Sequence, residues 1–245
     1  MEPVPLLAPD VGVDGVEIRV TTRRGGVSQA PYDSLNLGDH VGDASHCVGE
    51  NRRRVSAQLP TQDIHWIRQV HGIASVEAGM ESVPEADAQW TCERIQPLAV
   101  LTADCLPVVL ADREARCVGI AHAGWRGLAA GVLESLLQAM PVGAGSVTAW
   151  LGPVISAAAY EVGPEVKVAF ERGCGDAATA CFAPSDQEGR WMADLAALAR
   201  LRLIRAGVAQ ITEAGRCTLG EPEHFFSHRR DGAQTGRMAT LVWLG

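Results

Sequence analysis

The hydrophobic positions of the chain fall into short runs of strand length, separated by polar turns and by segments with helical spacing. Three of these runs, 97–105, 106–112 and 117–123, follow one another almost directly, so we expect them to be adjacent strands of one sheet. The runs that predict strands are 16–22, 64–72, 97–105, 106–112, 117–123, 146–153 and 239–245.

Longer segments between these runs have the spacing of helices. Leu128, Val132, Leu136 and Met140 recur every four residues and predict an amphipathic helix over 128–140. The other predicted helices are 44–59, capped by Ser45, then 163–173 and 192–207, the last ended by Gly207. Strands and helices alternate without a dinucleotide-binding fingerprint, which indicates an α/β fold with mixed sheets.

Composition narrows the class of protein. The 245 residues are 47% hydrophobic and carry a formal charge of −8, which argues against a nucleic-acid-binding protein. No apolar run reaches the ~18 residues of a membrane span, and the first residues do not resemble a secretory signal. Seven cysteines without a Cys-x-x-Cys pair indicate reduced thiols, so we expect a cytoplasmic protein.

Two histidines and a cysteine stand at the predicted ends of strands. His71, Cys105 and His122 each close an apolar run, and sites in α/β proteins are assembled at strand ends. Two imidazoles and one thiolate suit zinc, and three protein ligands leave a fourth position open for water or substrate. Scattered residues of these types can equally be packed core side chains. The residues alone leave both interpretations open.

Seven motifs in order along the chain resemble the YfiH-type laccase-domain family, whose members are labelled polyphenol oxidases or purine nucleoside phosphorylases. The motifs are TTRRGGVS, PYDSLNLGDHVGD, QVHG, TADCLPVVL, AHAGWRGL, LGPVISAAAYEVG and FFSHRRDGAQTGRMA. The resemblance implies one domain over 1–245, with mixed sheets layered between helices. It also implies that His71, Cys105 and His122 bind zinc and form the catalytic site, with copper as the metal of an oxidase activity.

Basic and polar residues near these motifs are candidates for substrate contact. Arg126 follows His122 at the start of a predicted helix, where free N–H groups and a guanidinium would stabilise phosphate. Asp104 is a candidate for orienting a ligating histidine, or equally a turn residue whose carboxylate accepts hydrogen bonds from backbone N–H groups. The other candidates for substrate or phosphate binding are Arg23, Asn36, Arg229 and Arg230, and Glu161 is a candidate general acid. His228 stands where the family usually has tyrosine.

The resemblance implies phosphorolysis of adenosine, inosine or methylthioadenosine, with adenosine deamination alongside. One alternative is a hydrolase that edits peptidoglycan precursors at the same site, where the nucleophile is either a metal-bound water or the thiol of Cys105 with a histidine as base. A non-catalytic zinc protein is another, and a copper-dependent polyphenol oxidase ranks lowest because the seven histidines form no His-x-His pair. We expect small-molecule partners, neither nucleic acid nor membrane, and a monomer or homodimer.

Overall fold

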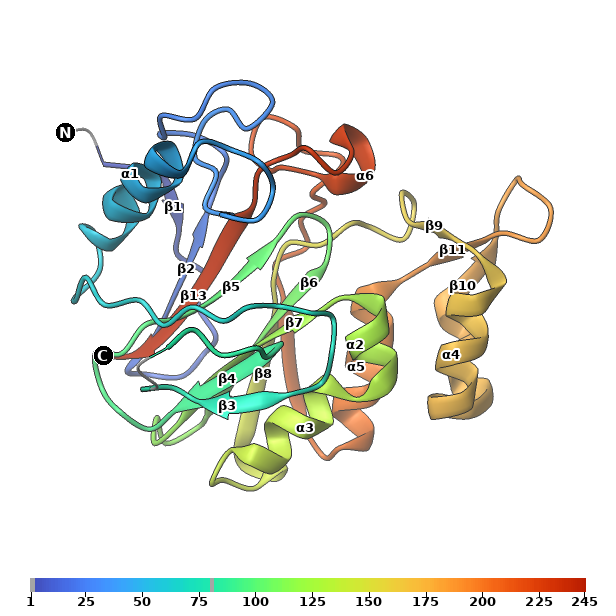
Figure 1. Cartoon of the computed structure of the whole chain (residues 1–245). Coiled ribbons are helices and arrows are strands. Elements are labelled where there is room, and N and C mark those ends of the chain that lie inside the picture. Colours follow the sequence, from blue (N-terminus) through green and yellow to red (C-terminus); the bar gives the residue numbers. More distant parts are fainter. Residues whose placement is uncertain (1–2, 80–81) are drawn as a thin grey trace.

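The computed structural model describes residues 3–79 and 82–245 and has a mixed α/β architecture built on three sheets (Figure 1). The largest sheet has six strands, in the order β12, β8, β6, β7, β4, β3. β12 pairs with β8 and β3 with β4 in parallel, and the other neighbours are antiparallel. Its strands are β3 (Ser75–Glu77), β4 (Ala88–Thr91), β6 (Leu106–Asp112), β7 (Val118–Ala123), β8 (Val147–Leu151) and β12 (Gln210–Glu213).

A four-stranded antiparallel sheet lies against one face of the six-stranded sheet. Its order is β1 (Leu6–Leu7), β2 (Val16–Thr21), β13 (Met238–Leu244), β5 (Leu98–Thr102). Side chains of β5 alternate between two cores, as a strand with two buried faces requires. Leu98 and Val100 pack between the sheets, whereas Ala99 and Leu101 face the outer core. This alternation makes β5 part of both hydrophobic cores.

Helices cover the outer faces of the two large sheets, so the layering predicted from the resemblance is confirmed. α1 (Ser45–Ser56) covers the four-stranded sheet, with Val55 in the outer core. α2 (Trp125–Ala130), α3 (Val132–Ala139) and α5 (Leu195–Arg205) cover the six-stranded sheet. The remaining elements are α4 (Pro164–Cys174), α6 (His228–Asp231), the 3-10 helices η1 (Ala144–Ser146) and η2 (Gly175–Cys181), and a small sheet of β9 (Glu161–Val162), β10 (Phe182–Pro184) and β11 (Trp191–Ala193). Among the described residues no helix is long and apolar enough to cross a membrane.

The structure corrects the prediction that three consecutive runs form one sheet. β6 and β7 pair in the six-stranded sheet, but β5 pairs with β13 in the other sheet. The chain crosses between the sheets at 103–105, where Asp104 has a φ of 90°. The hydrophobic pattern predicts that a strand is buried. It does not predict which sheet the strand joins.

Three further element predictions are wrong in part. Residues 64–72 form only isolated bridges, at His65 and Arg68, so His71 does not end a strand. The helix predicted over 128–140 starts earlier, at Trp125, and is interrupted at Gly131, whose φ of 110° ends α2 and precedes α3. Ala44, not Ser45, holds the N-cap position of α1. Local sequence patterns do not encode such breaks strongly.

Asp112 stabilises the turn between β6 and β7 and gives a testable prediction. Its buried carboxylate accepts hydrogen bonds from Nε and Nη2 of Arg116 at 2.7 and 3.0 Å, which lower the pKa of Asp112 from 3.8 to about 2. The stabilisation is therefore complete above pH 4 and is lost as the pH falls to about 2. We expect Asp112→Asn to lower the Tm at pH 7 by about 2–4 °C, and to have little effect near pH 2, in thermal melts. Glu114→Gln, at an exposed side chain beside Arg116, is the control and should change little; an equal loss at both pH values would contradict the assignment.

Candidate metal centre and adjoining cavity

His71, Cys105 and His122 come together although His71 and His122 are 51 positions apart in the sequence. One ligand atom of each lies within 4.8 Å of the other two. The two imidazole rings meet edge to face, with centroids 4.8 Å apart and planes at 83°. Cys105 directly precedes β6, and His122 lies near the end of β7, opposite Pro107. Pairing of β6 with β7 therefore places the thiol beside the buried imidazole.

Asp87 orients His122 and was not among the site residues predicted from the sequence. The Asp87 carboxylate is fully buried, and its Oδ1 lies 2.8 Å from Nδ1 of His122. A carboxylate is only an acceptor, so Nδ1 carries the hydrogen and Nε2 is left to act as a ligand. The backbone N–H of His122 also donates to the Asp87 carbonyl at 2.7 Å. Both contacts hold the ring in one orientation.

The same carboxylate holds the loop that carries His71. It accepts hydrogen bonds from the backbone N–H groups of Val70 at 3.1 Å, His71 at 3.0 Å and Gly72 at 2.6 Å. His71 has a φ of 60°, a conformation that is uncommon for a residue with a side chain. Three hydrogen bonds to one buried carboxylate provide the support for that conformation. Burial raises the pKa of Asp87, but the bonds from His122 and Gly72 outweigh it and lower the pKa overall.

Cys105 and His122 influence each other's ionisation. Burial disfavours the thiolate, but the charge of His122 and hydrogen bonds from both histidines lower the pKa of Cys105 to about 6. Burial also disfavours the imidazolium of His122, yet the negative charge of Cys105 and the bond to Asp87 raise its pKa to about 9. The site therefore favours a thiolate at neutral pH, which is the form that binds metals.

These three residues fit a metal ion with an open coordination position. The donor set of two imidazole nitrogens and one sulfur is typical of zinc. Gly124 leaves the space beside the ligands open, because a Cβ there would lie 2.9 Å from Cδ2 of His71 and 3.2 Å from Sγ of Cys105. A side chain at position 124 would thus collide with the ligands.

The ligands face a cavity of about 420 Å³, which we call the central cavity. This volume is within the range of small-molecule sites. Arg126, Arg229 and Arg237 give the wall a positive character, and Trp125 and Tyr160 provide aromatic surfaces. The residues that line the central cavity are His40, Gln69, His71, Leu101, Thr102, Ala103, Asp104, Cys105, His122, Trp125, Arg126, Ile155, Tyr160, His228, Arg229 and Arg237.

Two of the arginines predicted to contact substrate lie on this wall. Arg126 stacks on Trp125, with Cζ 4.4 Å from the ring centroid. Arg229 lies over the ring of Tyr160 at 5.2 Å, and its Nη1 donates to the carbonyl of Glu161 at 2.8 Å. Both side chains are exposed, and an anion entering the cavity can reach them.

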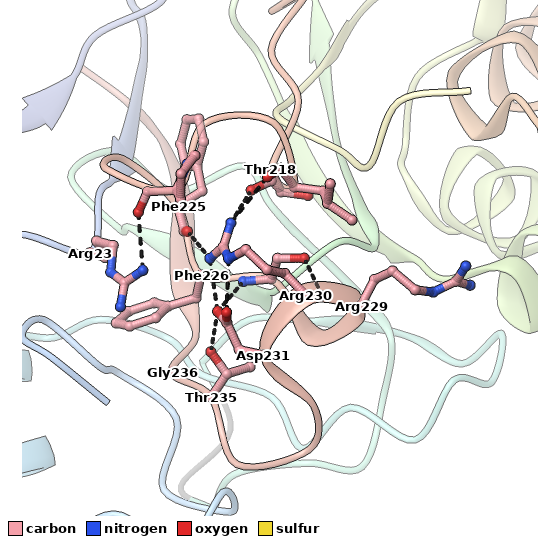
Figure 2. A network of polar contacts seen from close by, with 12 residues as sticks. Arg23, Thr218, Phe225, Phe226, Arg229, Arg230, Asp231, Thr235 and Gly236 are labelled. Atoms are coloured by element: carbon pink, nitrogen blue, oxygen red, sulfur yellow. Dashed lines mark hydrogen bonds and ion pairs between the residues drawn. The ribbon is translucent and has the colours of Figure 1, made fainter. Parts of the chain in front are cut away.

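The other three predicted contact residues lie elsewhere. Arg230 donates to Asp231 and to carbonyl groups of Thr218 and Phe225, whereas the side chain of Arg229 points away from this network (Figure 2). Arg23 donates to the carbonyls of Asp33 and Pro222 in a separate surface depression. Asn36 is buried, and its Oδ1 accepts hydrogen bonds from the backbone N–H groups of Gly38 and Arg237. None of these three residues lines the central cavity. The positions of Arg23, Asn36 and Arg230 therefore do not support the prediction that they contact substrate, which stays untested.

Asp104 organises the wall of the cavity and does not orient a histidine, which corrects our expectation. Its carboxylate accepts hydrogen bonds from Oγ1 of Thr218 at 2.6 Å, Oγ of Ser227 at 3.0 Å and the backbone N–H of Arg229 at 2.6 Å. Glu161, the candidate general acid, accepts a hydrogen bond from Ser185 through its carboxylate. It is not among the residues that line the cavity.

Tyr160, Arg237 and Gln69 line the cavity but were missed. Tyr160 and Arg237 lie within the quoted motifs, yet no spacing marks them as functional. For Asp87 the sequence does contain a weak indication of a role. An acidic residue directly before a buried strand needs a buried polar or charged partner. A second group of metal-binding side chains, Glu221, Glu223 and His224, also exists among the described residues, but Glu221 already pairs with Arg216.

Comparisons with known proteins find a matching family and several similar chains and crystal structures. Residues 17–245 match the family described as multi-copper polyphenol oxidoreductase laccase. The chain is 48% identical to a purine nucleoside phosphorylase of Pseudomonas aeruginosa, with 92% of each chain covered, and 45% identical to the purine nucleoside phosphorylase YfiH of Escherichia coli, with 94% of each covered. Two crystal structures have TM-scores of 0.92: a Neisseria meningitidis protein, 46% identical with 98% of each chain covered, and YfiH of Bacillus licheniformis, 29% identical with 100% of this chain and 97% of that chain covered.

The two roles of Asp87 lead to a prediction. Asp87→Asn should weaken binding of Co²⁺ by about 10- to 100-fold, the usual effect of removing a partner of a ligating histidine. The absorption bands of the Co²⁺–thiolate complex would report the titration. Asp63→Asn, at an exposed position, is the control. Unchanged Co²⁺ affinity in Asp87→Asn would mean that the carboxylate does not organise the ligands.

Proposed function

This chain belongs to the multi-copper polyphenol oxidoreductase laccase family, and from its cavity we propose that it is a zinc-dependent purine nucleoside phosphorylase. The observation that carries the proposal is the convergence of two imidazoles and one thiol on a cavity whose wall bears three arginines. The names of the relatives from Pseudomonas and Escherichia support the same activity. Adenosine, inosine and methylthioadenosine are the substrates we propose, with adenosine deamination as an additional activity.

His71, Cys105 and His122 would hold the zinc ion, and Asp87 would keep the two histidines in place. Bound zinc would supply a Lewis acid that polarises a substrate oxygen and stabilises developing negative charge. Zinc is favoured over copper because the described residues contain one cluster of histidine and cysteine ligands, whereas a multicopper oxidase needs several copper centres. The donor set of nitrogen and sulfur agrees with this choice.

The remaining wall of the central cavity suits a nucleoside and an anion. In phosphorolysis a phosphate oxygen forms a bond to the anomeric carbon of ribose, while the bond from that carbon to the purine nitrogen breaks. The purine leaves with the electron pair and takes up a proton. Arg126 can attract and orient the phosphate by charge. Burial, and then the negative charge of Cys105, raise the pKa of Tyr160, so its phenol stays protonated and can donate a hydrogen bond inside the cavity.

One alternative uses the same side chains without a metal. A thiol beside two imidazoles is also the arrangement of a Cys–His nucleophile, which would suit the hydrolysis of a peptidoglycan precursor. Alkylation of Cys105 does not separate the two proposals, because it would block a ligand and a nucleophile equally. Dependence on metal does separate them.

Metal removal is the first test. We expect the chelator-treated protein to release no adenine from adenosine in phosphate buffer, and we expect Zn²⁺ to restore the release. His71→Ala, Cys105→Ala and His122→Ala should each reduce the rate to that of the buffer blank while the circular dichroism spectrum stays that of the wild type. Full activity of metal-free protein, or of Cys105→Ala, would remove the basis of the proposal and favour another chemistry.

The products provide the second test. Adenine and ribose 1-phosphate should form only when phosphate is present, because phosphate is the nucleophile of that reaction. Inosine, the product of deamination, should form from adenosine with or without phosphate, since water is then the nucleophile. Chromatography of both reactions measures the two rates. Adenine release that does not depend on phosphate would indicate a hydrolase.

A further inference from the structure

Arg237 is a half-buried cation that faces the central cavity without an acidic partner. Its Nη1 donates to the carbonyl groups of Thr235 at 2.8 Å and Gly236 at 3.0 Å, and within 3–79 and 82–245 no carboxylate lies at ion-pair distance from it. Burial lowers the pKa of Arg237, and the more distant charges of Cys105, Asp104 and Tyr32 offset this effect only in part. A guanidinium stays charged at neutral pH even when it is half-buried. The positive charge of Arg237, which no adjacent carboxylate neutralises, is therefore available to a ligand.

A buried loop fixes the position of Arg237. Oδ1 of Asn36 accepts the backbone N–H of Arg237 at 2.9 Å, and the backbone N–H of Leu37 donates to the Arg237 carbonyl at 3.2 Å. The amide nitrogen of Asn36 donates to Asp43 at 2.9 Å, which holds the Asn36 side chain itself. The Arg237 side chain packs directly against Gly38. A Cβ at residue 38 would lie 2.8 Å from Cγ of Arg237, so any other residue there would displace the arginine.

The neighbours of Arg237 leave it as the fixed charge in its part of the cavity. Burial, and then the charge of Arg237, lower the pKa of His40, which disfavours a second positive charge beside Arg237. Arg126 and Arg229 also line the cavity, but they are exposed and lie over the rings of Trp125 and Tyr160. Buried side chains hold the backbone N–H groups of both Arg237 (Asn36) and Arg229 (Asp104), but of the three arginines only Arg237 is half-buried.

We propose that Arg237, positioned by Asn36 and Gly38, is the anchor for the phosphate that reacts in the central cavity. The inference rests on the proposed phosphorylase function, since it assigns the binding site of the second substrate. A guanidinium with free N–H groups can form paired, charge-assisted hydrogen bonds to a tetrahedral oxyanion. Inorganic phosphate and the phosphate of a nucleotide share this chemistry, and we assign the site to inorganic phosphate.

Kinetics of zinc-loaded variants test the assignment. Arg237→Met should raise the KM for inorganic phosphate by about 10- to 100-fold, the effect of losing hydrogen bonds to a charged group, while the KM for adenosine changes less than about twofold. Arg237→Lys should recover part of the loss, because it restores the charge without the paired geometry. Gly38→Ala keeps the guanidinium but displaces it, so it should also raise the KM for phosphate. Arg205→Met, an exposed position on α5, is the control.

A binding measurement separates this inference from the proposed function. Inorganic phosphate should raise the Tm of the wild type and of Arg205→Met, because a ligand that binds only the folded protein stabilises it. It should not raise the Tm of Arg237→Met. Wild-type phosphate dependence in both Arg237→Met and Gly38→Ala would overturn the inference and leave the phosphorylase proposal intact.

Two other results have distinct meanings. If the wild type releases no purine but phosphate stabilises it through Arg237, the proposed function fails and the anion site stands. If AMP raises the Tm through Arg237 but inorganic phosphate does not, the assignment to free phosphate is overturned. Circular dichroism shows whether each variant is folded. If Arg237→Met does not fold, the KM of Gly38→Ala for phosphate decides whether Arg237 anchors the phosphate, because this variant retains every atom of Arg237.

Discussion

The buried carboxylate of Asp87 is the interaction on which the candidate metal centre depends. It bonds to the ring of His122 and to three consecutive backbone N–H groups around His71. One charged group thus couples a rigid strand to a loop that has no strand pairing at His71. A buried carboxylate is stable only with such partners, so the loop and the ring satisfy Asp87 while Asp87 orients both.

The chain passes from one sheet to the other beside these ligands, and the connecting residues line the central cavity. β5 ends at Thr102 in one sheet, and β6 begins at Leu106 in the other. The connection carries Asp104, whose carboxylate bonds to Thr218, Ser227 and the backbone of Arg229. These bonds join the C-terminal segment that contains α6 to the crossing point, and the two lie side by side in Figure 1. Residues of this segment, among them His228 and Arg229, line the central cavity.

The distribution of charge explains how an acidic protein can receive an anion. The chain has a formal charge of −8, and most of its arginines are paired with carboxylates. The central cavity instead contains three arginines without carboxylate partners among the described residues, two of them exposed. A local positive field in a concave site attracts anions even when the whole protein is negative. The same concavity places an anion near the thiol and the two imidazoles.

The sequence alone determined the α/β class, the six longer strands β2, β5, β6, β7, β8 and β13, the helices α1 to α5, and the identity of the three ligand candidates. Hydrophobic periodicity marks buried strands, and the motifs around His71, Cys105 and His122 are local features of the chain. Only the tertiary structure decided that β5 leaves the sheet of β6 and β7, that Asp87 supports both histidines, and that Arg237 and not Arg230 faces the cavity. These outcomes depend on contacts between residues far apart in sequence, such as Asn36 with Arg237. Local patterns carry no record of such partners, because a buried polar group needs a partner but does not specify which segment provides it.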